Sequence, residues 1–214
     1  MICISFCEPD FAKCLYQVKK EELAEIRLDL VDYSEEEIKQ IFSCGTKLIA
    51  TCRAGKFTDE ERKAKLVKAI ESGAAYVDIE LESTAGYRQY LMQVAKRHNC
   101  QVIISFHDFE KTPALFDLLK VIETASGWGA DITKIACMVN DIKDVSRLLG
   151  LYNSKGKIVA FGMGDKGQFS RVASLILGAE FTFAVLDESK QTAPGQLTKQ
   201  QVEKALDFLN NLKS

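Results

Sequence analysis

The chain has 214 residues, of which 47% are hydrophobic and 27% are charged, so it is long enough to bury the core of a globular protein. Its formal net charge of −2 and its lack of a long basic run argue against nucleic acid and against an anionic membrane as partners. No apolar stretch approaches the roughly 20 residues that span a bilayer, and the first residues lack the basic and apolar segments of a signal peptide.

Cysteine and histidine usage indicates a reducing compartment and no metal site. The seven cysteines are an odd number, contain no Cys-x-x-Cys pair and lie partly within apolar runs, which favours buried thiols in a cytoplasmic protein. The two histidines, His98 and His107, have no partner at a metal-ligand spacing. We therefore expect a cytoplasmic protein without a bound metal.

Short apolar, β-branched runs alternate with longer amphipathic segments along the chain. Ser34, which precedes three glutamates, has the pattern of a helix N-cap. Strands are predicted at residues 2–6, 25–30, 47–52, 76–81, 101–106, 132–138, 157–161 and 181–185. Helices are predicted at residues 9–18, 35–42, 59–72, 86–98, 114–126, 143–152, 168–177 and 199–212.

Eight strand–helix units, with a strand roughly every 25 residues, predict parallel strands joined by right-handed crossovers. Eight such units indicate an α/β fold of the closed (β/α)8 TIM-barrel type, near the short end of its usual size. The alternative is a doubly wound open sheet, which is disfavoured because no glycine-rich turn of the dinucleotide or P-loop kind is present. Since the sequence contains no linker, residues 1–214 are expected to form a single domain.

Charged side chains recur on one face of successive predicted strands. Glu25, Arg27 and Asp29 share one parity, whereas the apolar residues of that strand, up to Leu30, have the other and should face the helices. Charges inside a barrel need opposite charges and hydrogen bonds around them, and barrel active sites lie at the carboxyl ends of the strands. The same parity places inside the barrel Thr51, Arg53, Asp78, Glu80, Ser105, His107 and Lys134.

Lys134 and His107 carry the strongest chemical signal. Lys134 lies in the middle of an apolar strand, where an ammonium group is costly. Desolvation lowers the pKa of a lysine, and a neutral amine can form a Schiff base with a ketone. His107 is the natural proton carrier beside it. Alternatively, Lys134 pairs with Asp78 or Glu80 or reaches the rim, and His107 is structural.

Polar residues after the last two predicted strands form a candidate carboxylate site. Arg171 follows the seventh strand, and an arginine can bind a carboxylate in bidentate fashion. Thr192 and Gln196 follow the eighth strand and can complete its hydrogen bonding. The loops after strands seven and eight are a common anion site in barrels. Taken alone, these residues are a helix start and a turn.

At these residues the chain resembles the type I 3-dehydroquinate dehydratases, enzymes of the shikimate pathway in aromatic amino acid (chorismate) biosynthesis, which have the (β/α)8 fold. Each motif is short and weak by itself, but seven occur in the family's order over most of the chain. The matching segments are residues 25–29, 51–53, 105–109, 134–136, Met163, the pair 170–171 and residues 193–196.

The resemblance implies a reaction and a set of residue roles. Lys134 would form an iminium with the C3 ketone of 3-dehydroquinate, and His107 would remove a proton from C2 and help to make and hydrolyse the imine. The products would be 3-dehydroshikimate and water, with no metal or organic cofactor. The resemblance assigns substrate binding to Arg171, Gln196 and Thr192 at the C1 carboxylate, to Glu25, Arg27 and Arg53 at the ring hydroxyls, and to Met163 against the ring.

One feature of the chain departs from the family pattern, and the oligomeric state and the rival functions stay open. The family often carries a loop Glu-Gly-Gly after the third-strand arginine, but residues 54–60 lack it, so Asp59 or Glu60 either replaces that glutamate or caps the next helix. The family precedent is a homodimer. A class I Schiff-base aldolase or transaldolase, and a non-catalytic metabolite-binding barrel, are the alternative functions.

Overall fold

The strands of the computed structural model pair in parallel, and each of the first seven is followed along the chain by an α-helix. The structure describes residues 1–211. Their contacts group into two units, one formed by residues 1–4 and 105–214 (its last three residues lie outside the description) and the other by residues 5–104. The expectation of a single domain over residues 1–214 stays a prediction.

The elements follow the predicted alternation. The strands are β1 Ile2–Phe6, β2 Leu23–Arg27, β3 Lys47–Thr51, β4 Tyr76–Glu80, β5 Gln101–Asp108, β6 Ile132–Met138, β7 Ile158–Met163, β8 Thr182–Val185 and β9 Leu197–Thr198. The helices are α1 Phe11–Val18, α2 Glu35–Phe42, α3 Asp59–Glu71, α4 Ala85–Arg97, α5 Leu115–Gly127, α6 Ile142–Leu149, α7 Gln168–Ile176 and α8 Lys199–Asn211. Short 3₁₀ turns cover Gly150–Asn153, Asp165–Gly167 and Glu188–Lys190.

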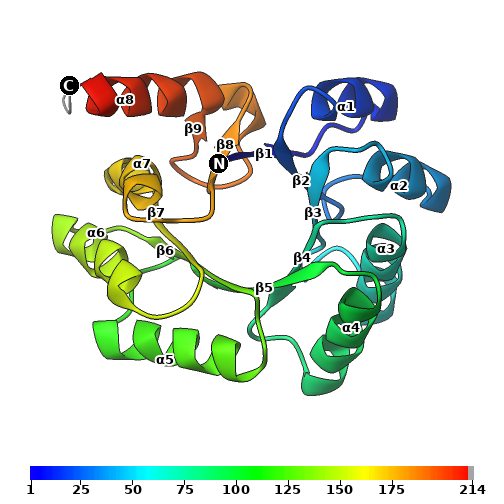
Figure 1. The fold of residues 1–214 in the computed structure, drawn as a ribbon, viewed down its shortest axis with the longest axis horizontal. Helices are drawn as coiled ribbons and strands as arrows, with labels where there is room; N and C mark the ends of the chain where they lie inside the picture. The colour runs from blue at the N-terminus through cyan, green and yellow to red at the C-terminus, as the bar shows by residue number, and fades with distance from the viewer. Residues whose placement is uncertain (212–214) are drawn as a thin grey trace. The chain divides into compact units, whose positions relative to one another are not determined.

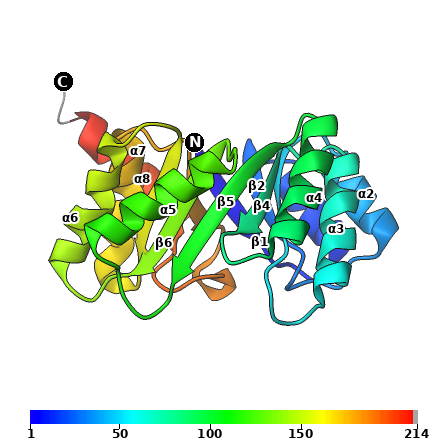
Figure 2. The ribbon, with the colours of Figure 1, turned by 90° about the horizontal axis from the view of Figure 1, so that it is seen from below.

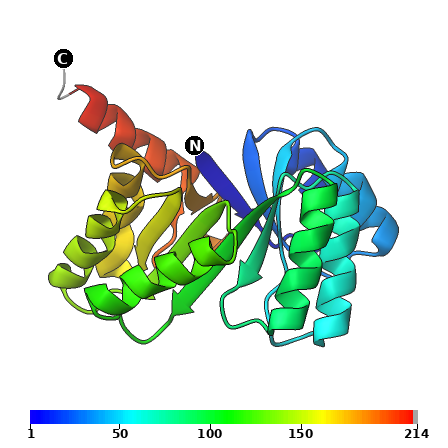
Figure 3. The same ribbon diagram turned by 60° about the horizontal axis from the view of Figure 1, so that its bottom comes forward.

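In the unit of residues 5–104, β2, β3 and β4 form parallel neighbours covered by helices. Arg27 on β2 pairs in register with Thr51 on β3, which pairs with Asp78 on β4. Figure 1 shows α2, α3 and α4 along one face of these strands, and α3 lies beside both α2 and α4 (Figures 1 and 3). The apolar residues of the strands are therefore buried against the helices, and the polar residues between them have the opposite direction.

In the other unit, β6 pairs in parallel with β7, and β8 pairs with both β1 and β9. Helices α5 and α6 pack against β6 and β7, and α7 packs against β7 and β8 (Figure 2). A cluster of buried apolar residues lies between β6, β7 and the helices α5 and α6. Among its fully buried members are Leu118, Ile135, Cys137 and Leu148. The alternate residues of β6, Lys134 among them, therefore point away from this cluster.

Helix starts are fixed by side-chain caps. Ser34, as predicted, caps α2 in a capping box with Glu37. Thr58 does the same for α3 with Glu61, and Asp141 does so for α6. Because a capping box satisfies backbone donors that the helix leaves unpaired, these residues set where each helix begins after its loop.

The second predicted strand is displaced. The strand covers Leu23–Arg27 rather than residues 25–30, and the chain turns at once, with Leu30 N–H donating to Arg27 O. Leu30 was expected to face the helices, but it is 48% exposed, so that expectation was wrong. The turn has a physical reason, since it brings the Asp29 carboxylate onto the Arg27 guanidinium two residues before it.

Other ends differ by a few residues. β5 extends through Asp108 and β7 through Met163, so both His107 and Met163 lie within strands. The short β9 was not predicted because two residues carry no periodicity. The last helix was predicted at residues 199–212. In the structure it covers Lys199–Asn211, and Leu212 lies outside the described residues. Parallel strands with intervening helices confirm the α/β class.

Candidate active site

Lys134 is buried in the middle of β6, as its sequence context predicts. Its side chain is 2% exposed, and its Nζ lies 4.3 Å from the centroid of the Phe183 ring on β8. An ammonium over an aromatic face is attracted by the negative face of the ring, which partly offsets the loss of water. The sequence predicted Phe183 only as part of a strand and did not predict its contact with Lys134.

Arg171, at the start of α7, is the largest of the fully buried side chains in the described part of the chain. Its guanidinium carbon lies 4.5 Å from the centroid of the Phe161 ring, and its two terminal nitrogens donate over 3.5 Å and 3.4 Å to the carbonyls of Phe183 and Pro194. Its Nε has no hydrogen-bond partner, and no carboxylate among residues 1–211 contacts it. Burial lowers the pKa of Arg171 to about 10, so the group is still a cation at neutral pH.

The rings of Phe161 and Phe183 connect the side chains of Lys134 and Arg171. Their centroids are 5.9 Å apart, with Lys134 over one ring and Arg171 over the other. Sequence analysis missed this aromatic pair. A signal was available, because Phe161 has the parity of Met163 two residues later and so faces the same side of β7. The arrangement holds an amine and an unpaired guanidinium on one apolar surface.

The loop before β9 is held against the turn after β7. Pro194 O accepts from the Gly164 N–H at 3.1 Å as well as from Arg171. Gly195 has φ +69°, and a Cβ there would lie 2.4 Å from the Gly164 carbonyl oxygen, so only glycine allows this approach. The position of the loop therefore depends on a backbone contact with Gly164. The sequence of the loop predicts a turn but does not predict this contact.

Thr192 and Gln196, both in this loop, bond to each other. The Gln196 Oε1 accepts from the Thr192 backbone N–H at 2.9 Å and from its hydroxyl at 3.1 Å. Gln196 is 2% exposed. Its amide is therefore held with the oxygen toward Thr192 and the donor Nε2 pointing away from Thr192. Thr192 thus orients Gln196, a role that was not predicted.

His107 and Met163 lie on strands of the same unit. His107 is partly buried near the end of β5, which neighbours β6 in the sheet, and its ring stacks on Phe109 with centroids 6.1 Å apart. Met163 is 1% exposed at the end of β7 and pairs in register with Met138. Both are therefore near the carboxyl ends of their strands, where parallel sheets place their ligand sites.

Glu25 is the central carboxylate of the unit of residues 5–104. It is 2% exposed, and its two oxygens accept hydrogen bonds from Ser5 and Thr51, each at 2.8 Å. The two hydroxyls come from β1 and β3, the strands on either side of β2 in the sheet. A buried carboxylate held by two hydroxyl donors has a fixed orientation.

Arg27 forms a bidentate ion pair with Asp29. Its Nε and Nη2 donate at 3.0 Å and 2.6 Å to the two carboxylate oxygens, and both residues are more than nine-tenths buried. Burial alone would lower the pKa of Arg27, but the hydrogen bonds to Asp29 and the charge of Glu25 raise it. Within the described part of the chain, Nη1 makes no hydrogen bond, so one edge of the guanidinium is left for a ligand.

Arg53 is partly buried and lies two residues after the end of β3, and the acidic residues that follow it are engaged in the next helix. Asp59 pairs with Arg62 at 2.9 Å and Glu60 pairs with Lys63 at 2.6 Å, both three residues along the helix. Asp59 and Glu60 therefore stabilise α3 here, which agrees with the second of the two interpretations open from the sequence.

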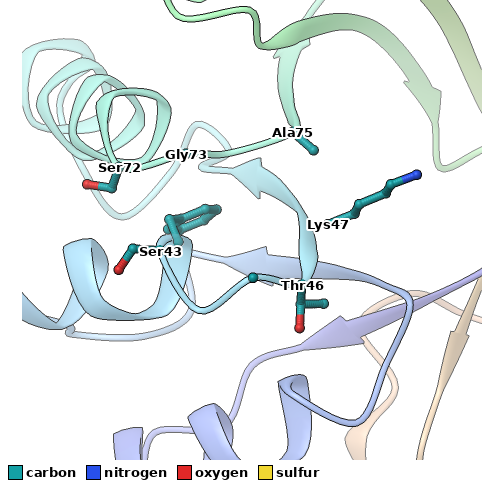
Figure 4. A pocket seen from close by; sticks show the side chains of 8 residues that line it. Ser43, Thr46, Lys47, Ser72, Gly73 and Ala75 are labelled. Carbon is teal, nitrogen blue, oxygen red and sulfur yellow. The ribbon is translucent and has the colours of Figure 1, made fainter.

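Figure 4 shows a pocket of about 350 Å³ at the opposite ends of the strands. It is lined by residues from the end of α2 to Lys47, the first residue of β3, and by Ser72, Gly73 and Ala75 between α3 and β4. Ligand sites of parallel α/β sheets lie at the carboxyl ends of the strands, whereas Lys47 begins β3. None of the predicted site residues lines this pocket. Residues 1–211 also contain no cluster of metal-ligating side chains.

Comparison with known proteins identifies the family. A sequence model of the type I 3-dehydroquinase family matches residues 2–213. The 3-dehydroquinate dehydratase of Desulfotalea psychrophila is 36% identical over 210 residues, covering 92% of each chain.

Solved structures agree. The 3-dehydroquinate dehydratase of Aquifex aeolicus has a TM-score of 0.82 at 29% identity and covers 95% of this chain and 96% of its own. The type I enzyme of Clostridium difficile has a TM-score of 0.85 at 23% identity, covering 98% and 92%. These matches confirm the predicted barrel fold class. The chain belongs to the type I 3-dehydroquinase family.

Proposed function

We propose that this chain is a hydro-lyase that converts 3-dehydroquinate to 3-dehydroshikimate and water through a Schiff base on Lys134. The observation that carries the proposal is that the buried Lys134 amine and the buried Arg171 guanidinium lie on the two contacting rings of Phe183 and Phe161. In 3-dehydroquinate, the ketone and the carboxylate are on carbons separated by C2 alone. An amine for the ketone and a guanidinium for the carboxylate on one surface suit that molecule.

The chemistry follows from these groups. The Lys134 amine adds to the C3 carbonyl, and loss of one water gives an iminium, which withdraws electrons from C2. His107 takes the C2 proton, and the resulting enamine expels the C1 hydroxyl, which leaves as water with a proton from the imidazolium. Addition of one water then hydrolyses the imine and frees Lys134. The net change is the loss of one water from C1 and C2.

The remaining residues are proposed to hold and orient the substrate. Arg171, with its unpartnered Nε, binds the C1 carboxylate as a charge-assisted donor. Gln196, oriented by Thr192, donates to the same carboxylate. The ring hydroxyls are bound by Glu25, Arg27 and Arg53, and Met163 packs on the ring. Fixing the carboxylate determines which C2 hydrogen meets His107.

Borohydride trapping tests the proposal directly. The protein is incubated with 3-dehydroquinate and sodium borohydride, and its mass is measured and mapped to peptides. We expect an adduct on Lys134, absent in Lys134→Ala, while a control replacement of the half-exposed Lys157 leaves the adduct in place. No adduct on folded protein that still dehydrates the substrate would refute the Schiff base.

A second measurement separates the roles of Lys134 and His107. His107→Ala should lower kcat by about 100-fold to 10,000-fold, the usual contribution of a general acid or base. It should still form some trapped adduct, because the amine remains. If it forms none and binds no substrate, His107 has a structural role.

The same assays distinguish the rival functions. An aldolase or transaldolase would turn over phosphorylated or aldehyde substrates and would not need Arg171 for a carboxylate. A non-catalytic barrel would bind a metabolite without turnover. Family membership favours the dehydratase over both.

We also propose that the enzyme acts as a homodimer in the cytoplasm, as a single catalytic domain without a nucleic-acid partner. No helix in residues 1–211 is long and apolar enough to cross a membrane, and none of the seven cysteines, all of which are described, forms a disulfide. Light scattering after size-exclusion chromatography tests the dimer, since a mass near the monomer's 23.9 kDa would refute it.

A further inference from the structure

The backbone on both sides of Arg53 is held by one ion pair. The carbonyl of Cys52, the residue before it, accepts from Arg62 Nε at 2.9 Å. The N–H of Ala54, the residue after it, donates to Glu80 Oε2 at 3.1 Å. Arg62 Nη2 donates to the same Glu80 oxygen at 2.5 Å. Arg62 and Glu80, which hold the backbone on the two sides of Arg53, are therefore also bonded to each other.

Arg62 is itself fixed from several sides. The Thr58–Glu61 capping box begins α3 just before it, and Asp59 accepts from its Nη1 at 2.9 Å. Its guanidinium carbon lies 5.1 Å from the centroid of the Tyr87 ring on α4. Burial by itself lowers the pKa of Arg62, but Tyr87 and Glu80 raise it, so the group stays charged. With its side chain 5% exposed, Arg62 acts as a rigid donor rather than as a solvated surface charge.

The loop beyond Arg53 has weaker support. Ala54, Gly55 and Lys56 are exposed, and the Lys56–Asp32 pair joins side chains that are 50% and 78% exposed. Exposed pairs of this kind contribute little to order. The buried pair at the root of the loop thus restrains the direction in which Arg53 leaves β3.

We propose that Arg62 and Glu80 are a positioning pair for Arg53, which fixes its guanidinium for the substrate without either residue binding the substrate. The inference rests on the proposed function, in which Arg53 binds a ring hydroxyl of 3-dehydroquinate. The proposal also gives a role to Glu80, which the sequence predicted only as a charge inside the barrel. Its carboxylate accepts hydrogen bonds from the Ala54 N–H and from Arg62.

A double-mutant cycle tests this pair. KM and kcat for 3-dehydroquinate are measured for wild type, Arg62→Met, Arg53→Met and the double variant, with Lys63→Met as the control on the neighbouring helix position. We expect Arg62→Met to raise KM about 10-fold and to change kcat by less than about 3-fold, because a misplaced ligand side chain weakens binding most. The double variant should match Arg53→Met within about 2-fold, since Arg62 acts through Arg53.

Each other result refutes the positioning role. An unchanged KM in folded Arg62→Met does so, as does a double variant whose effects multiply, because Arg62 would then act independently of Arg53. If Arg62→Met does not fold, Arg62→Lys and Glu80→Gln take its place in the cycle and are read by the same criteria. Turnover of 3-dehydroquinate by wild type is scored separately, so a protein that dehydrates the substrate but shows no coupling refutes the positioning pair alone.

Discussion

Two buried arginines of this chain have opposite surroundings. Arg27 has its charge balanced by Asp29 through two hydrogen bonds. Arg171 has an aromatic ring and two distant carbonyl oxygens, and no described carboxylate contacts it. Removing one partner of a buried ion pair leaves an uncompensated charge and destabilises the protein, whereas a buried cation without a carboxylate partner gains a strong charge-assisted interaction when an anion binds. This difference is the reason why Arg171, rather than Arg27, is proposed to bind the carboxylate of the substrate.

The largest expected effect is on stability at Arg27. Arg27→Met leaves Asp29 buried without its cation, so the free energy of unfolding should fall by about 3 kcal/mol or more. Urea denaturation measures it, with Lys63→Met as the control, since its exposed pair should be worth less than about 1 kcal/mol. Replacing both Arg27 and Asp29 by apolar residues should recover much of the loss. Equal stability of Arg27→Met and wild type would contradict the comparison.

Arg171→Met should behave in the opposite way. It removes an unbalanced buried cation, so the free energy of unfolding should stay constant or rise. KM for 3-dehydroquinate should rise about 100-fold, as expected for losing a buried charge-assisted contact. Denaturation and steady-state kinetics on the same preparation provide both numbers. A loss of stability as large as that of Arg27→Met would show that Arg171 is structural.

The loop that contacts Arg171 provides a smaller test. In Gly195→Ala, the new Cβ meets the Gly164 carbonyl, and the positive φ is strained, so the loop with Gln196 should shift and KM should rise about 10-fold. Gly86→Ala is the matched control, because a Cβ there meets nothing within 4 Å and alanine favours its helix. If Gly195→Ala leaves KM unchanged, the loop does not position the carboxylate site.

The smallest effect is on pH dependence. Because burial lowers the pKa of Arg171 to about 10, its charge is complete at pH 8 and half lost near pH 10. A carboxylate binds only the charged form, so its affinity should fall as pH rises through this value. The Kd of quinate, which has no ketone to form an imine, should be about 2-fold higher at pH 10 than at pH 8. Arg171→Met should bind it weakly, with no such dependence; wild type with a flat profile would contradict the assignment.

Much of the fold was predictable because local patterns repeat. The strands β1 and β6 and the helix α2 have the predicted bounds, since β-branched runs and a capping box are properties of neighbouring residues. β2 was misplaced because the Arg27–Asp29 pair, an interaction across a turn, ends the strand early. Leu28 is buried in that turn although it lies beyond the end of the strand. The apolar run in the sequence is therefore longer than the strand, and the predicted strand ended too late.

The sequence by itself determined the residue types of the candidate site and their parity. Glu25, Lys134 and Arg171 are buried as charged residues, and the motif order led to the family. The tertiary structure alone decided which charges are balanced. Whether Arg171 meets a carboxylate or a phenyl ring, and whether Glu80 faces a ligand or a backbone N–H, depends on side chains far apart in the chain. The periodicity of a sequence predicts only on which side of a helix or strand a residue lies. It cannot predict which side chain from another part of the chain will pack against that residue.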